Sequence, residues 1–173
     1  MNRNDMLAWW DHFRTVNGIT LRIIQSVPKD KIDTRLVKDM RTPKELIAHM
    51  YNTMREMAEG AARGEIKMTD EMDAAVVAKL KTHDDIVRYA EESWKATDKA
   101  IRSMSEAQVN AMVKSPWGRD FPGFVCVNII YDEHIHHRGQ LYAYLRIMGV
   151  APVMMWDFEN NAPEYRQKQA QQA

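Results

Sequence analysis

The strongest constraint on the fold of this chain is a repeat of apolar residues every three or four positions, sustained over several long segments. In the first segment, from about Asp5 to Val27, one stripe carries the repeat: Met6, Trp10, Phe13, Val16, Thr20, Ile23 and Val27. This spacing matches the turn of an amphipathic helix, about 3.6 residues. Pro28 follows and ends the predicted helix.

The other segments carry the same period and have clear boundaries. Residues 42–45, Thr-Pro-Lys-Glu, form a capping box with proline at the first helical position, and they predict a helix that continues to about Ala62. Further helices are expected over about 70–80, 82–104 and 124–148, with turns over 105–123. Glycine and proline, 7 and 6 of the 173 residues, stand mostly between these segments. Four long helices joined by polar connections predict an all-α four-helix bundle.

Length and composition argue against several classes of protein. A chain of 173 residues suits one domain, and we expect a single domain over 1–162 followed by a polar, frayed tail over 163–173. Acidic and basic residues balance at 24 each, which disfavours nucleic acid and anionic membranes as partners. No stretch approaches about 18 consecutive apolar residues and no apolar leader follows the first residues, so we expect a cytoplasmic protein.

The candidate chemistry is concentrated in the last predicted helix. Three of the six histidines, His134, His136 and His137, lie within four residues there, beside Glu133. At about 100° per residue, His137 falls near the centre of the apolar stripe, with Glu133 about 40° to one side and His134 about 60° to the other. His136 lies about 100° away, at the edge of the stripe. Residues three or four apart project side by side, so Glu133/His137 and His134/His137 are both plausible chelating pairs.

A third ligand for such a pair must come from another helix, and His49, on the inner face of the second helix, is the candidate. Two or three imidazoles with a carboxylate suit a divalent Zn, Ni or Fe ion with one position left open for water, and Mn is a further alternative. The same side chains also suit a buried polar network, in which Glu133 accepts hydrogen bonds from both imidazoles. The residues alone leave both arrangements open.

Neighbouring residues have expected roles of their own. His134, His136 and Arg138 are candidates for supporting the ligands or for acid–base work, and Arg138 is either half of an ion pair or the binding residue for a substrate anion. Cys126, the only cysteine, lies about three turns before the histidines and is expected in the core rather than at the metal. Gly139 weakens a helix, which suggests that another helix approaches closely there.

Two motifs resemble those of the DinB-like (DinB/YfiT) superfamily. Residues 136–149, His-His-Arg-Gly-Gln-Leu-Tyr-Ala-Tyr-Leu-Arg-Ile-Met-Gly, resemble its last-helix signature, and residues 40–49, Met-Arg-Thr-Pro-Lys-Glu-Leu-Ile-Ala-His, resemble its second-helix motif. The resemblance implies a four-helix bundle with a long crossover connection, often a homodimer, and a divalent ion, commonly Ni or Zn, on a histidine triad. His49 and His137 match two members of that triad. The middle position is Glu133 here, so either Glu133 replaces the imidazole or His134 takes its place.

The resemblance also implies candidate functions. Known activities in the superfamily include thiol-dependent transfer and isomerisation. We therefore expect a metal-dependent enzyme of the S-transferase or hydrolase type, in which the ion activates a low-molecular-weight thiol or water against a small-molecule substrate. No nucleophile of the chain itself is evident. The alternatives are a non-catalytic metal-binding or stress- and damage-response module, and a member that has lost its metal. Resemblance of fold does not choose among them.

Overall fold

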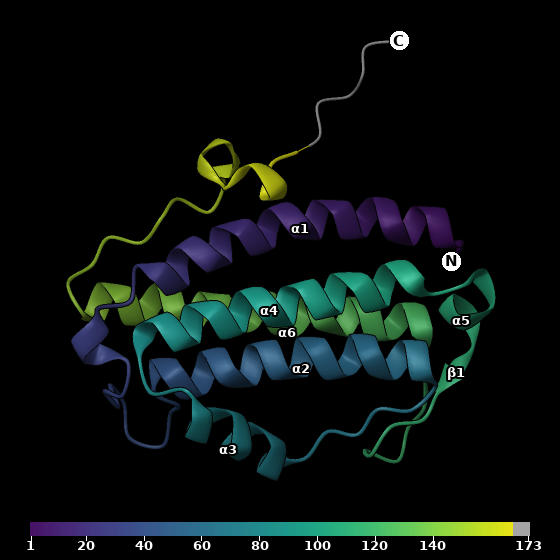
Figure 1. Ribbon diagram of the computed structural model, residues 1–173, viewed down its shortest axis with the longest axis horizontal. Coiled ribbons are helices and arrows are strands. Elements are labelled where there is room, and N and C mark those ends of the chain that lie inside the picture. Colours follow the sequence, from purple (N-terminus) through teal and green to yellow (C-terminus); the bar gives the residue numbers. More distant parts are fainter. Residues whose placement is uncertain (168–173) are drawn as a thin grey trace.

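The structure, a computed structural model, describes residues 1–167, apart from the side chain of Asp70, and is mostly helical (Figure 1). Four long helices dominate it: α1 (Arg3–Gln25), α2 (Pro43–Arg63), α4 (His83–Ser103) and α6 (Gly123–Ile147). Each begins and ends within about two residues of the segment expected from the apolar period, which confirms those expectations. The short helix α3 (Asp70–Lys79) is also confirmed. Among the described residues, none of the helices combines the length and apolar character needed to cross a membrane.

Reciprocal capping sets where two of the long helices begin. Thr42 Oγ1 accepts from the backbone amide of Glu45 at 3.2 Å, and Glu45 Oε2 accepts from the amide of Thr42 at 2.8 Å. The predicted capping box is therefore present, with Pro43 as the first helical residue. α4 starts with the same reciprocal pair, between Thr82 and Asp85. These bonds satisfy amides that the first turn of a helix leaves without partners.

The direction of each helix follows from contacts at one end of the molecule. The guanidinium of Arg3, at the start of α1, donates to the carbonyls of Arg102 and Met104 at the end of α4. Gln108, just after α4, donates to the carbonyl of Ala62 near the end of α2. The start of α1 and the ends of α2 and α4 therefore lie together, and α2 runs parallel to α4. Figure 1 shows the start of α6 at the same end of the molecule. Two parallel helices need a connection that returns along the molecule, and residues 64–82 with α3 provide it (Figure 1).

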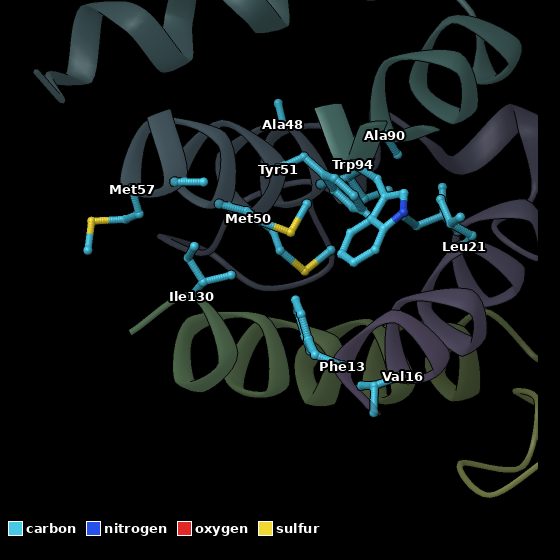
Figure 2. Close-up of a cluster of buried hydrophobic side chains, with 14 of the residues drawn as sticks. Phe13, Val16, Leu21, Ala48, Met50, Tyr51, Met57, Ala90, Trp94 and Ile130 are labelled. Carbon is cyan, nitrogen blue, oxygen red and sulfur yellow. The ribbon is translucent and has the colours of Figure 1, made fainter. Parts of the chain in front are cut away.

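The core lies between the four long helices. α2 packs against α4 and α6, and α1 packs against the same two helices. Trp10 of α1 stacks on Trp94 of α4 with ring centroids 5.2 Å apart, and Figure 2 shows Phe13 of α1 opposite Met50 of α2 within the same cluster. Burial of large apolar side chains is the main favourable term in folding, and methionines such as Met50 fill irregular gaps between helices.

The segment 105–123 holds more regular structure than the expected turns. It contains the short helix α5 (Glu106–Asn110) and two strands, β1 (Met112–Val113) and β2 (Phe121–Pro122), which pair antiparallel. Strands of two residues cannot show a period-two pattern, so the sequence carried no signal for them.

The expectation of a frayed tail from residue 163 is wrong for the first residues of that tail. Residues 163–165 form a 3₁₀ turn in which Tyr165 is only 7% exposed. Asn161 Nδ2 donates to the carbonyl of Thr15 at 2.9 Å, and a Cβ on Gly18 would lie 2.5 Å from Cβ of Tyr165. The segment therefore docks closely on α1 where a glycine leaves room. The rest of the predicted tail, 168–173, lies outside the described residues.

Gly139 does not mark the close helix contact that we expected. The residue is exposed on α6, and a Cβ built there would meet no heavy atom within 4 Å. Within residues 1–167, no other part of the chain therefore requires glycine at this position.

Candidate metal centre

Three side chains from two helices converge at the half of the molecule that holds the start of α2. His49 lies in the second turn of α2, and Glu133 and His137 lie one turn apart on α6. One potential ligand atom from each residue lies within 4.8 Å of the other two. The rings of His49 and His137 stand nearly perpendicular, with centroids 5.0 Å apart. The His137 side chain is 7% exposed and that of Glu133 is 42% exposed, so the cluster is open to solvent on the Glu133 side.

A carboxylate that the sequence analysis did not identify, Asp73, contacts Nδ1 of His49. Asp73 Oδ2 lies 2.5 Å from Nδ1 of His49, and Asp73 Oδ1 accepts from Nδ2 of Asn52 at 2.6 Å. Burial opposes ionisation of this carboxyl, but the bonds from His49 and Asn52 hold the pKa of Asp73 below its usual value. An acceptor at Nδ1 selects the tautomer of His49 that has a free lone pair on Nε2. This arrangement is typical of metal-binding histidines.

His137 has a similar arrangement with a weaker acceptor. Its Nδ1 lies 3.4 Å from Oε1 of Gln140, and its Nε2 lies 3.2 Å from Oε2 of Glu133. Burial lowers the pKa of His137, and the charges of His49 and His136 act in the same direction. When Nδ1 carries the proton, the Nε2 lone pair faces an anionic carboxylate, and a cation between the two relieves their repulsion.

The donor set and its spacing fit a divalent transition metal. Ligand atoms bound at about 2.1 Å lie roughly 3–4 Å apart around one ion, so small rotations of the three side chains from the observed spacing are sufficient. Two imidazole nitrogens and one carboxylate oxygen are ligands that Zn, Ni and Fe accept. The residues present therefore fit the ion that the sequence suggested.

The structure does not bring His134 to this cluster. His134 is 1% exposed, and its Nε2 lies 2.7 Å from Oγ1 of Thr20 on α1. The rings of Phe13 and Tyr51 pack edge-on against it, at 4.9 and 5.9 Å. Burial lowers the pKa of His134 to about 3, with the charges of Arg138 and His137 acting in the same direction, so the ring is neutral at physiological pH.

The other two candidates, His136 and Arg138, lie on opposite sides of α6. His136 is exposed, its ring centroid is 4.9 Å from that of His137, and its Nε2 accepts from Nε2 of Gln140 at 3.0 Å. Arg138 is buried on the side of α6 that faces α1, and no hydrogen bond or ion pair within residues 1–167 joins it to the cluster. Only His136 is therefore placed where both solvent and His137 are within reach.

A cavity adjoins the cluster through Gln140. Its volume is about 480 Å³, and it is lined by Arg35, Asp39, Met40, Arg41 and Gln140. Arg35 is already engaged by both carboxylate oxygens of Glu45, at 2.9 and 3.0 Å. Since Gln140 also contacts His137, a molecule in this cavity would lie beside the cluster.

Comparison with known proteins places these observations in a family. A model described as the DinB family matches residues 1–169. The uncharacterized protein YjoA of Bacillus subtilis (strain 168) is 21% identical over 140 residues, which are 80% of this chain and 87% of that protein. The crystal structure of this DinB-like protein matches with a TM-score of 0.65, covering 80% of this chain and 89% of that one.

A second solved structure, a mutant of the mycothiol-dependent maleylpyruvate isomerase, matches with a TM-score of 0.63 at 18% identity. The match covers 82% of this chain but 63% of the isomerase, so this chain spans less than two thirds of that protein. At these identities, both structural matches establish a shared fold and leave the reaction open.

Proposed function

The chain belongs to the DinB family, and from this membership we propose that it is a metal-dependent enzyme that activates a thiol or a water molecule for attack on a small electrophilic substrate. The observation that carries the proposal is the convergence of His49, Glu133 and His137, with Asp73 bound to the far nitrogen of His49. The bond from Nδ1 of His49 to Asp73 leaves Nε2 of His49 without a proton, and Nε2 of His137 lies 3.2 Å from Glu133, so the cluster offers ring nitrogens and a carboxylate that can bind one ion.

We also propose a specific fold class, an oligomeric state and a location for this member of the family. The pattern of helix contacts and the return connection over 64–82 support a four-helix bundle with a long crossover, forming one domain over the expected residues 1–162 and the docked residues 163–165. A homodimer and a cytoplasmic location are part of the proposal. A free, buried Cys126 is compatible with a reducing compartment.

The proposed ligands are His49, Glu133 and His137, with Glu133 rather than His134 as the third. Ni or Zn is the first choice of ion, and Fe or Mn is the alternative. Glu133 lies one helical turn from His137 and faces it, whereas His134 is turned into the core against Thr20. A glutamate therefore takes the place that a histidine holds in the family triad.

A divalent ion in this site would lower the pKa of a thiol or water bound at its open position, so that the nucleophile forms at neutral pH. The chain would supply the remaining functions. Asp73 and Gln140 orient the two imidazoles, and exposed His136 is placed to move a proton at the solvent edge. The cavity beside Gln140 would hold the substrate.

Metal analysis of untagged protein tests the ligand set. The wild type, purified without added metal or chelator and then reloaded with Ni, Zn, Mn or Fe(II), is expected to hold near-stoichiometric metal. His49→Ala, Glu133→Gln and His137→Ala should lose it. His134→Ala is the matched control on the same helix and should retain it. Absence of metal in the reloaded wild type would overturn the metalloenzyme proposal, and a loss in His134→Ala alone would overturn Glu133 as the third ligand.

Turnover separates the enzyme from the alternative module. The metal-loaded protein is incubated with low-molecular-weight thiols and electrophiles, and with esters and amides for hydrolysis. Metal-dependent product formation that is lost in His137→Ala supports the enzyme. Stoichiometric metal binding without turnover across these classes would instead favour a non-catalytic metal-binding or stress-response module.

A further inference from the structure

Arg138 places a charged guanidinium inside the fold without a counter-charge. The residue is only 6% exposed, its Nη1 is buried without a hydrogen-bond partner, and no carboxylate among the described side chains pairs with it. Buried charges in proteins are normally paired and hydrogen-bonded, because an isolated ion loses its hydration without compensation. An unpaired arginine at this depth therefore requires an explanation.

Two further polar atoms beside Arg138 are also buried without partners. They are Oη of Tyr142 and Nδ1 of His134, and the three residues follow one another at intervals of four along α6. The guanidinium carbon of Arg138 lies 6.0 Å from the centre of the Tyr142 ring. His134 contacts Thr20 of α1, so this side of α6 faces α1. Thr20 Oγ1 donates to the carbonyl of Val16, so it accepts from Nε2 of His134, and Nδ1 of His134 is an acceptor. The unpaired donors on this stretch of the helix are therefore the Arg138 guanidinium and the Tyr142 hydroxyl.

The charge around Tyr142 is strongly unbalanced. Arg146 also lies near this ring, with the guanidinium carbon 5.8 Å from the ring centre, and the charge of Arg22 of α1 also acts on this tyrosine. Of these three arginines, Arg22 is paired with a carboxylate: its Nη2 lies 2.6 Å from Oδ2 of Asp157. Three guanidinium groups against one carboxylate create a local positive potential that favours an anion.

We propose that Arg138 and Tyr142, on the α1-facing side of α6, bind a small oxyanion: one carboxylate or phosphate group of a small molecule. A guanidinium binds such a group through paired N–H donors, and the tyrosine hydroxyl adds a third donor. Because Arg138 is nearly enclosed, the bound group is compact. This site lies on a different side of α6 from His137 and its occupancy requires no metal, so it stands apart from the proposed function.

Anion-linked stability of the full chain tests the proposal. The thermal midpoint is measured with increasing sodium formate or sodium phosphate at constant ionic strength, balanced with sodium chloride. The wild type is expected to gain about 4 °C at ten times the dissociation constant, and above that constant the gain should rise with the logarithm of the anion concentration. Comparing formate with phosphate distinguishes a carboxylate site from a phosphate site.

Matched variants locate the effect. Arg138→Met keeps the apolar stem and should lose the gain, while its own midpoint stays equal to or above that of the anion-free wild type. Arg146→Met removes an exposed guanidinium near the same tyrosine and should keep most of the gain, because its charge adds only to the local potential. If Arg138→Met does not fold, two other measurements test the site. Tyr142→Phe should reduce the gain in the thermal midpoint, and anion binding to the wild type should shift the NMR resonance of the Arg138 Nε–H group.

Two results would overturn the proposal. One is a wild type whose thermal midpoint in either anion equals that in sodium chloride and whose Arg138 resonance does not move, which would assign the buried donors to water. The other is an equal loss of the response in Arg138→Met and Arg146→Met, which would assign it to general surface charge.

Discussion

Asp73 Oδ2 lies 2.5 Å from Nδ1 of His49, and through this bond the short helix α3 is fastened to the candidate metal centre on α2. The same carboxylate accepts from Asn52, one turn along α2. Because both donors are on α2 and the acceptor is on α3, the position of the crossover segment and the orientation of a proposed ligand depend on each other.

Asp73→Asn is expected to raise the dissociation constant for the metal about 10–100-fold, because the amide accepts more weakly from Nδ1 of His49 and carries no charge. Metal titration against a competing chelator measures the effect. NMR of the metal-free protein should also show a larger share of the other His49 tautomer. Glu71→Gln, an exposed change on the same helix, is the control and should leave both quantities unchanged. Equal affinities for Asp73→Asn and wild type would remove Asp73 from the site.

The parts of this molecule that were predictable depend on local patterns. The start of α2 follows from the Thr42/Glu45 box, and the proximity of Glu133 and His137 follows from one helical turn. The contact of Asp73 with His49 was not predictable, because the sequence of residues 64–82 does not indicate which helix this segment packs against. Helix angles predicted that His134 lies beside His137. In the structure His134 faces the core, because the position of α1 brings Thr20 against the His134 ring, and the sequence does not indicate that position.

Cys126 is expected to be inert in the native protein. The residue is buried on α6, and burial raises the pKa of its thiol from about 9 to about 11. A rise of two pKa units lowers the thiolate fraction at pH 8 about 100-fold, and enclosure slows modification further. Labelling with a thiol reagent at pH 8 should be slow until denaturant is added. Cys126→Ala should retain any thiol-dependent activity, and loss of activity in a folded variant would place the nucleophile on the chain.

Stability is expected to fall at alkaline pH partly through Tyr165. Burial raises the pKa of Tyr165 to about 12, with the charges of Glu164, Glu91 and Asp98 adding to it, whereas an unfolded tyrosine titrates near 10. Between those values the folded chain holds a proton that the unfolded chain loses, so this contribution is complete below about pH 10 and is lost as pH rises toward 12.

Tyr165→Phe isolates that contribution. The variant should lose free energy of unfolding less steeply above pH 10, by up to about 1.4 kcal/mol per pH unit. Urea unfolding at several pH values measures the slope. Identical slopes in the two proteins would show that Tyr165 is not enclosed in solution and that the segment over 161–165 is undocked.

Gly139 and Gly18 form a contrasting pair on two helices. A Cβ at Gly139 meets no heavy atom within 4 Å, so Gly139→Ala should stabilise the monomeric fold by about 0.5–1 kcal/mol, since alanine loses less backbone entropy in a helix. A Cβ at Gly18 would lie 2.5 Å from Cβ of Tyr165 and 2.6 Å from Nδ2 of Asn161. Gly18→Ala should therefore destabilise by about 1–3 kcal/mol and expose the C-terminal segment to proteases.

Urea unfolding and limited proteolysis measure both variants. Destabilisation by Gly139→Ala would contradict the expectation and would mean that another surface packs against this exposed glycine in solution. Because nothing within residues 1–167 packs there, that surface would belong to a second molecule. Repeating the unfolding at several protein concentrations settles the point: a concentration-dependent midpoint in the wild type that Gly139→Ala abolishes would place the proposed homodimer contact on this face of α6.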